Sequence, residues 1–531
     1  MIRILIFLLI SIVFAQNKLN MPYDFSKHQG YIINNGNIVW NQDWQSGHFF
    51  FDGTFSNYPS TFGPNIESNY YNTTLDTVMS DSSYTSSYFD YMQGDYYLDN
   101  LDIGIKYAVD NKLARLHAFK KRYAGAYNQY TILSGPPNPI HYTYLGTYSI
   151  KGHKNKLDLS IGNFNSDFGL LDSLGTGFID SRITSSNISY TREYDSTYFK
   201  INAHNFLQRY SSQHSEFSIS GVRYLTRTKV AGSIIFLRKH NYNFSIIADI
   251  NKRSLRSESF KSIGWGSMKI GLNHNNYSFN VGGISIENNQ NFIVDGKINY
   301  SQGRFMVKTG FNHYYKPLHI VLLDSTSFEE RDQLMFNGLW SLNKIKIGTH
   351  VYSNSVERNI KDSQYNSLLL PNNSSNIWFY GFIKYQAFDN LLLELGYNKM
   401  SSDDYITDGI NERINLKLNN YFKLFSQAMT VYTSLSVSGF LGRNNDYVLH
   451  PIDQYPIKID SDNLLKNIWL MNFSVSFRVK SLYVKYEMNN LTNIIYDYLG
   501  SDEQDNNIQF NPYFPSMRRL ASLSIKWNFI D

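Results

Sequence analysis

The strand-like segments in the second half of this chain are joined alternately by short and long links. The short links are residues 301–304, 342–344, 388–390 and 479–481. The long links are roughly residues 315–332, 354–376, 439–465 and 489–518. A soluble sandwich has no reason to keep tight turns at one end and long loops at the other, whereas a transmembrane β-barrel has short periplasmic turns and long external loops. The alternation therefore predicts an outer-membrane barrel.

Apolar and polar residues alternate within these segments, as they do in a strand with two different faces. In the clearest case Trp469, Met471 and Phe473 alternate with Asn472 and Ser474. The same pattern recurs in residues 101–109, 292–300, 391–398 and 482–488. We therefore predict an all-β chain that forms one large antiparallel transmembrane barrel, with no separate soluble domain. Counting such segments between residues 96 and 529 gives about 22 strands, within a range of about 18 to 24.

The N-terminus is typical of an exported protein. Arg3 precedes an apolar run, Ile4 to Phe14, which ends in the small residue Ala15. This run is too short to span a bilayer comfortably, so residues 1–15 are predicted to be a cleaved signal peptide. We expect residues 16–95 to form an N-terminal segment, with weak strands near 31–40 and 47–56 and a long loop over 57–94. The barrel is expected to occupy residues 96–531 in the outer membrane of a Gram-negative bacterium.

Composition narrows the function classes. Aromatic residues make up 16% of the chain, which suits the aromatic girdles at the two membrane interfaces. Cysteine is absent, so a disulfide framework and a thiolate metal site are excluded. The formal net charge of +5 is scattered along the chain and gives no reason to expect nucleic-acid binding.

The last forty residues carry a family resemblance. Asn490-Leu491-Thr492-Asn493 opens the last long link, with Tyr496 soon after, and residues 515–519 lead into a final alternating strand. This stretch resembles the end of the barrel in TonB-dependent receptors. Within that resemblance, four outward positions of the final strand match the insertion signal that the barrel-assembly machinery reads: Leu523, Ile525, Trp527 and Phe529.

Two features depart from that family. Ile530 and Asp531 follow the aromatic residue that should be terminal. Residues 16–94 are too short for the N-terminal plug of such a receptor, and no coupling box is recognisable near residues 16–25. The resemblance therefore implies a plug-less barrel, and energised uptake by this chain alone is not predicted.

No catalytic or metal-binding pattern stands out in the sequence. There is no nucleophile elbow, phosphate-binding loop, His-Glu-x-x-His motif or EF-hand loop. The 13 histidines are scattered, with His274 and His313 beside turns or loops and His350 on a polar strand face. We therefore predict no enzymatic activity, no cofactor and no metal site.

The strand positions that are predicted to face the lumen carry an excess of positive charge. Basic residues outnumber acidic ones there, which favours small polar or anionic solutes. The candidate pore-lining residues are Lys297, Lys308, Lys346, Lys384, Lys417, Arg478, Lys485, Asp295, Glu394 and Glu487. An equally good explanation is that charges simply prefer the wet side of the wall.

Residues 163–182 form a long link where the count of turns requires a short periplasmic one. We therefore predict that residues 167–180 fold inward and narrow the pore. The candidates for this constriction are Asp167, Gly169, Gly175, Gly177 and Asp180.

Two functions remain open. The leading interpretation is a porin-like channel for passive or facilitated passage of small polar solutes. The alternative is a plug-less receptor-like barrel whose lumen is filled by its own loops or by a partner chain, acting in binding, surface display or export. An empty barrel of about 22 strands would be an unusually wide hole, because barrels of that size are normally plugged. The solute, and any partner protein or homo-oligomer, cannot be read from the sequence.

Overall fold

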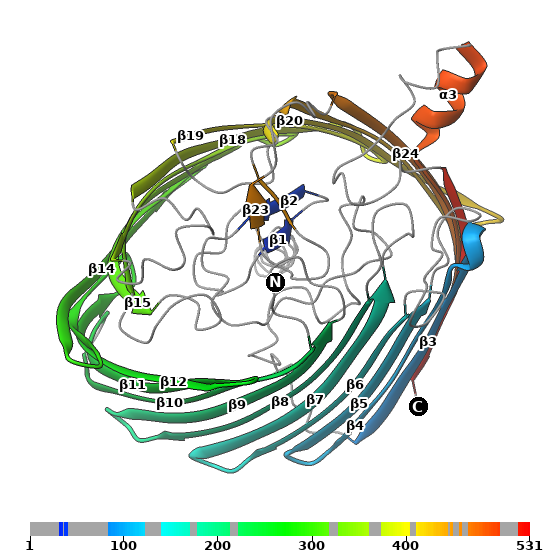
Figure 1. Cartoon of the computed structure of the whole chain (residues 1–531). Coiled ribbons are helices and arrows are strands. Elements are labelled where there is room, and N and C mark those ends of the chain that lie inside the picture. The colour runs from blue at the N-terminus through cyan, green and yellow to red at the C-terminus, as the bar shows by residue number, and fades with distance from the viewer. Residues whose placement is uncertain are drawn as a thin grey trace.

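The computed structural model is a closed antiparallel β-barrel of 22 strands (Figure 1). It describes residues 31–34, 37–40, 83–122, 140–169, 178–212, 221–239, 241–317, 328–359, 373–403, 410–443, 447–449, 456–458, 466–499 and 519–530. The predicted fold class and strand number are both confirmed. No helix among these residues is long and apolar enough to cross a membrane. The predicted signal peptide and the weak strand near 47–56 lie outside the described residues.

The barrel strands follow one another around the ring in chain order. They are β3 (Tyr84–Gly94), β4 (Asp99–Val109), β5 (Lys112–Arg122), β6 (Ile140–Lys151), β7 (Asn155–Gly169), β8 (Phe178–Glu193), β9 (Tyr198–Ser212), β10 (Gly221–Lys239), β11 (Tyr242–Arg256), β12 (Phe260–His274), β13 (Tyr277–Ile286), β14 (Asn289–Gln302), β15 (Phe305–Pro317), β16 (Phe328–Ser341), β17 (Ile345–Asn359), β18 (Asn373–Phe388), β19 (Leu391–Asp403), β20 (Ile410–Leu424), β21 (Met429–Arg443), β24 (Ile468–Val479), β25 (Leu482–Asn489) and β26 (Leu520–Ile530).

Four short strands and two helices complete the described elements. The strands form two separate hairpins, β1 (Tyr31–Asn34) with β2 (Asn37–Trp40), and β22 (Tyr447–Leu449) with β23 (Pro456–Lys458). The first hairpin coincides with the weak strand region predicted at 31–40. The 3-10 helix η2 (Asp95–Tyr97) joins β3 to β4, and the α-helix α3 (Leu491–Leu499) follows β25.

The first and last strands close the barrel. β26 pairs with β3, so residues 522–530 lie opposite residues 86–94. The sequence analysis had placed residues 84–94 in a long loop before the barrel, and that boundary is wrong. The strand was missed because its outward positions include Thr85, Ser87 and Gln93, which weaken the apolar alternation.

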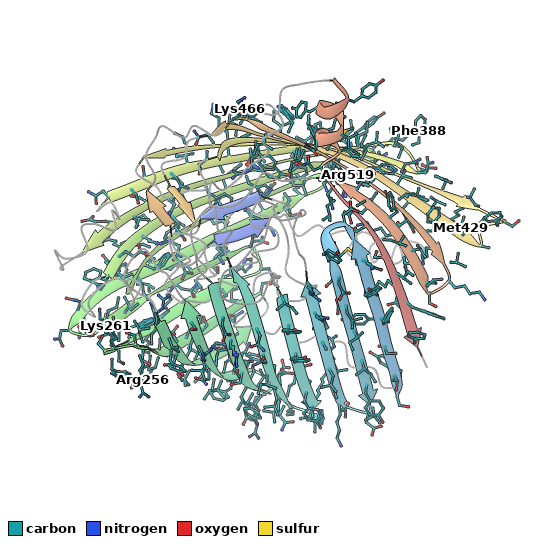
Figure 2. The ribbon with its side chains drawn as sticks, turned by 45° about the vertical axis from the view of Figure 1, so that its right-hand side comes forward. Arg256, Lys261, Phe388, Met429, Lys466 and Arg519 are labelled. Carbon is teal, nitrogen blue, oxygen red and sulfur yellow. The ribbon has the colours of Figure 1, made fainter. Side chains whose placement is uncertain are left out.

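The alternation of links is confirmed from β14 onward, whereas the outer links between β11 and β12 and between β13 and β14 have only three and two residues. At one end of the barrel consecutive strands are joined by two to four residues. Two of these turns have the left-handed backbone that tight hairpins require, at Asp110 (φ 49°) and Gly303 (φ 56°). We call this the periplasmic end and the opposite end the outer end. In Figure 2, Phe388 and Met429 mark the periplasmic end, whereas Lys466 and Arg519 mark the outer end.

The predicted inward fold of residues 167–180 is wrong for the residues that the structure describes. Asp167 lies in β7 opposite Asp180 in β8, and Gly169 lies opposite Phe178. The link between these strands falls at the outer end, where long links belong. The order of short and long links is therefore kept here. Most of the residues that were predicted to form a loop belong to the strands β7 and β8. Gly175 and Gly177 lie outside the described residues.

The outward face of the barrel is apolar and aromatic. On β11 to β13, Tyr242, His274 and Tyr277 stack beside the periplasmic end, with ring centroids 4.5 Å and 4.7 Å apart. Side chains such as Leu116 and Ile298 are more than half exposed in the wall. Exposure on this scale places the outward face against lipid, where apolar surface need not be hidden from water.

Candidate solute-binding lumen

All ten candidate pore-lining residues lie on the inward face of the wall. Each of them alternates along its strand with the outward-facing residues and therefore lies on the opposite face. Lys297 precedes the exposed Ile298, and Lys417 precedes the exposed Leu418. The same registers place Leu523, Ile525, Trp527 and Phe529 on the outward face, where each is 40–49% exposed. Whether the first group carries solutes and the second directs assembly remains a prediction.

Several of the inward charges neutralise one another. The Nζ of Lys384 lies 2.9 Å from a carboxylate oxygen of Glu394, and Lys485 lies 2.7 Å from Glu487. Asp295 pairs with Lys269, at 2.6 Å, and also accepts a hydrogen bond from Asn280. Among the described residues Lys297, Lys308 and Lys417 have no ion-pair partner, so they carry the excess positive charge of this part of the lumen.

Exposure changes sharply along the lumen. Toward the periplasmic end Lys297, Lys308 and Arg478 are exposed. Toward the outer end inward side chains are buried, as with Arg331 of β16 and Asn354 of β17, both 0% exposed. The lumen is therefore covered at its outer end, whereas beside β14, β15 and β24 its periplasmic end is open. Beside β4 to β6 the periplasmic end is covered as well, because the inward side chains of Ala108, Leu113 and Ser149 are each 1% exposed.

Four buried arginines lie at the outer end of the inward face. Each is within three residues of the end of its strand and at most 5% exposed: Arg223 of β10, Arg253 of β11, Arg331 of β16 and Arg413 of β20. Arg331 donates through Nη2 to Glu329 Oε1 at 2.8 Å, and both side chains are 0% exposed. The Arg253 guanidinium lies 5.0 Å from the ring centroid of Trp265, which holds it by a cation–π contact.

The sequence analysis missed these arginines. Each of them occupies an inward position in the alternation of its strand, so the sequence pattern could have identified them. They were not identified because each lies near a strand end, outside the segment that was predicted to be a strand. Among the described residues one buried carboxylate lies at that height, Glu329.

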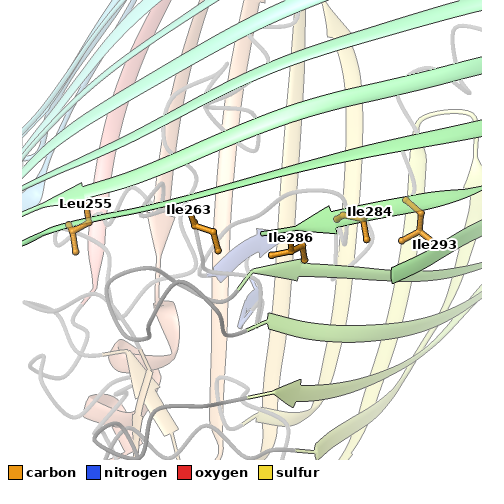
Figure 3. Packing of buried hydrophobic residues seen from close by; sticks show 5 residues of the cluster. All are labelled: Leu255, Ile263, Ile284, Ile286 and Ile293. Atoms are coloured by element: carbon orange, nitrogen blue, oxygen red, sulfur yellow. The ribbon is translucent and has the colours of Figure 1, made fainter. Parts of the chain in front are cut away.

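An apolar cluster covers the inward face of β11 to β14 at the same height (Figure 3). Its members are at most 7% exposed: Leu255, Ile263, Ile284, Ile286 and Ile293. In Figures 1 and 2 the β1–β2 and β22–β23 hairpins lie inside the ring of strands. Aromatic side chains of neighbouring wall strands pack against the cluster and supply part of its cover: Trp265, Tyr314, Tyr315 and Phe328.

A ring stack lies further along the inward wall. The imidazole of His350 stacks against Tyr380 and Phe382, with centroids 5.7 Å and 6.2 Å away. Its Nδ1 lies 2.5 Å from Asn337 Oδ1, which also accepts a hydrogen bond from Tyr352. This packing makes His350 a structural residue of the wall in the described part of the chain.

One group on the outward face has the donor atoms of a metal site. His313 Nδ1 lies 2.7 Å from Asp332 Oδ1 and 3.9 Å from Glu330 Oε1. The three ligand atoms lie within 4.8 Å of one another, near the outer ends of β15 and β16. The sequence analysis did not predict this group, because the three residues come together only through the strand register. Asp332 is exposed and Glu330 is partly exposed, and such acidic groups are common without a metal.

Similar folds occur among solved structures. The ferric enterobactin receptor PfeA from Pseudomonas aeruginosa, determined as a mutant with enterobactin bound, aligns with a TM-score of 0.62 at 11% identity, over 85% of this chain and 82% of that one. The FrpB iron transporter from Neisseria meningitidis aligns with a TM-score of 0.64 at 8% identity, over 85% and 83%. The siderophore receptor PirA from Acinetobacter baumannii aligns with a TM-score of 0.62 at 9% identity, over 85% and 81%.

No protein-family model and no curated protein matches the chain. The likeness to these receptors is therefore one of fold. It confirms the resemblance that the C-terminal forty residues suggested: the chain has the 22-stranded barrel of TonB-dependent receptors. At identities this low, the likeness says nothing about which solute the lumen holds.

Proposed function

We propose that this protein is a receptor-type transport barrel of the outer membrane, which binds a small anionic solute in an occluded lumen. The observation that carries this proposal is the complete burial of inward-facing side chains at the outer end, including Arg331 and Ile286. A lumen filled at one end cannot conduct steadily. The sequence-based alternative, a receptor-like barrel with a filled lumen, is therefore better supported than an open porin.

The inward lysines support an anionic solute. Lys297, Lys308 and Lys417 point into the lumen and have no ion-pair partner among the described residues, and a ring of positive charge favours anions. The neighbouring folds include receptors whose names record enterobactin, iron and siderophores. A ferric chelate with net negative charge is consequently the first solute class to test.

Conductance across a planar bilayer tests whether the lumen is occluded. We expect the full-length protein to be silent, and a variant without residues 31–40 to open, because the deletion removes a hairpin from the lumen. Steady channels from the full-length protein would contradict the proposal and support the porin-like interpretation.

Binding tests the solute class separately. Ferric enterobactin, and the uncharged chelate ferrichrome as a control, can be titrated against the full-length protein in detergent while its tryptophan fluorescence is followed. We expect the anionic chelate alone to bind, and the double variant Lys308→Gln/Lys417→Gln to weaken its binding at least tenfold. Lys252→Gln is the control, because Lys252 is exposed on the outward face. Equal binding of both chelates would rule out charge as the basis of recognition.

A further inference from the structure

The helix α3 exposes its apolar face and buries polar side chains, whereas a helix that packs on a protein core does the reverse. Leu491, Ile494, Ile495 and Tyr498 recur at the spacing of one helix face. Yet Ile494, Ile495 and Tyr498 are 37%, 43% and 89% exposed. The side chains that are buried are polar, with Thr492 8% exposed and Asn493 5% exposed. The apolar face of α3 therefore points away from the protein.

The polar face fastens α3 to an open edge of the wall. β25 pairs with β24 only from Phe473 to Val479, so no strand in the described part of the chain pairs with the outer end of β24 on that side. There the backbone N–H of Met471 donates to Thr492 Oγ1 at 2.9 Å. The backbone N–H of Asn490 donates to the side-chain oxygen of Asn472, also at 2.9 Å. These bonds fix which side of the helix faces the barrel.

The barrel strand that leads into α3 is short. β25 has 8 residues, whereas β10, elsewhere in the ring, has 19. A tilted strand needs about 9 to 11 residues to cross the hydrocarbon layer of a membrane. The chain therefore leaves the wall at β25 close to the outer edge of that layer, and α3 begins there.

The apolar face of α3 continues the lipid-facing surface of the barrel. Trp469, 38% exposed, and Met471 lie on the outward face of β24, beside which the helix is attached. Figures 1 and 2 show α3 outside the ring of strands, at the outer rim. In the same low section of the rim, Tyr97 of η2 is 78% exposed. Exposed tyrosines at this height are typical of a membrane interface.

We propose that α3 is an interfacial anchor, whose apolar face lies in the outer leaflet of the membrane and holds the low side of the rim at the lipid surface. Short helices with one apolar face bind membranes in this way, with that face buried at the boundary between headgroups and acyl chains. The lipid is the occupant that the geometry favours, because the exposed face is continuous with the lipid-facing wall.

Single-cysteine labelling tests the proposal, since the chain contains no cysteine of its own. Ile495→Cys and Tyr498→Cys, each labelled with the fluorophore NBD, are reconstituted as full-length protein in phosphatidylethanolamine–phosphatidylglycerol vesicles. Leu116→Cys is the lipid-facing control, because Leu116 is outward and 65% exposed. Glu258→Cys is the aqueous control on the same side of the membrane, because Glu258 is exposed in the link between β11 and β12 at the outer end.

We expect the labels at 495 and 498 to be quenched by doxyl lipids, as at 116, and to be protected from iodide at least threefold relative to 258. Iodide quenching equal to that at 258 would overturn the proposal. It would also be the result if a partner protein, absent from the vesicles, covered this face. Correct folding of each variant is checked by its heat-dependent shift in electrophoretic mobility, so a misfolded variant cannot imitate either result.

Discussion

Ile525 in the last strand lies directly opposite Tyr91 in the first strand, and this register closes the barrel. Both side chains point outward, so the closing seam presents an apolar surface to lipid on each of its two strands. The edges that β3 and β26 would otherwise expose are paired along nine residues. Full closure removes free strand edges, which would otherwise be open to pairing with other chains.

A charge at the seam should be costly only on the outward face. We expect Ile525→Lys to lower the free energy of unfolding by about 2–4 kcal/mol, because a lysine would face hydrocarbon near the middle of the membrane. Ser524→Lys is the matched control, since Ser524 is next in the chain but faces the lumen. Urea unfolding in lipid vesicles measures both. Equal losses would show that the two faces of β26 are assigned wrongly.

The ion pair between Glu329 and Arg331 should be essential to the packing of the occluded half. Both side chains are 0% exposed, so Glu329→Gln would leave a buried guanidinium without its carboxylate. We expect a loss of about 3 kcal/mol, the usual cost of breaking one side of a buried pair. Thermal unfolding in detergent provides the measurement.

Glu330→Gln is the control for that variant, because Glu330 is the next residue and lies on the outward face. Its loss should stay below about 1 kcal/mol, as for other partly exposed charges. The double variant Glu329→Gln/Arg331→Met should recover part of the stability, since it removes the stranded charge. A double variant less stable than Glu329→Gln would mean that Arg331 has a separate structural role.

The apolar cluster at the outer end should act as a seal. Ile286 is 0% exposed on the inward face, so Ile286→Lys would place a charge among Ile263, Ile284 and Ile293. We expect this variant to raise single-channel conductance above the silent baseline while the wall stays folded. Ser285→Lys, exposed on the outward face of the same strand, should remain silent. Silence in both variants would show that the lumen is sealed elsewhere.

Strand faces could be predicted from the sequence because they depend only on a period of two. Lys297 and Trp469 were assigned to the correct faces by this rule, and neither assignment required knowledge of any distant residue. Strand ends were harder to predict. β7 continues through Asn163 and Asn165. Because these side chains are polar, apolar and polar residues do not alternate there, and that part of the strand was predicted to be a loop.

Contacts between strands lay beyond the sequence altogether. Arg253 meets Trp265 across the β11–β12 hairpin, and His313 meets Asp332 across β15 and β16. Each contact follows from a register, and a register shifts whenever a strand end is misplaced by one residue. For this reason the lumen charges were predicted individually, while their ion pairs and the buried arginines were not.

The lumen should prefer anions once its outer end is opened. Lys297, Lys308 and Lys417 point inward without an ion-pair partner among the described residues, whereas Lys384 and Lys485 are neutralised. In the variant without residues 31–40, the reversal potential in a salt gradient should show a modest anion preference. That preference should fade as salt rises, because the Debye length falls from about 10 Å at 0.1 M to about 3 Å at 1 M.

Adding Lys308→Glu and Lys417→Glu to this variant should reverse the anion preference. Lys252→Glu should leave it unchanged, because Lys252 is exposed on the outward face. Cation preference at low salt without these substitutions would show that other charges control the lumen.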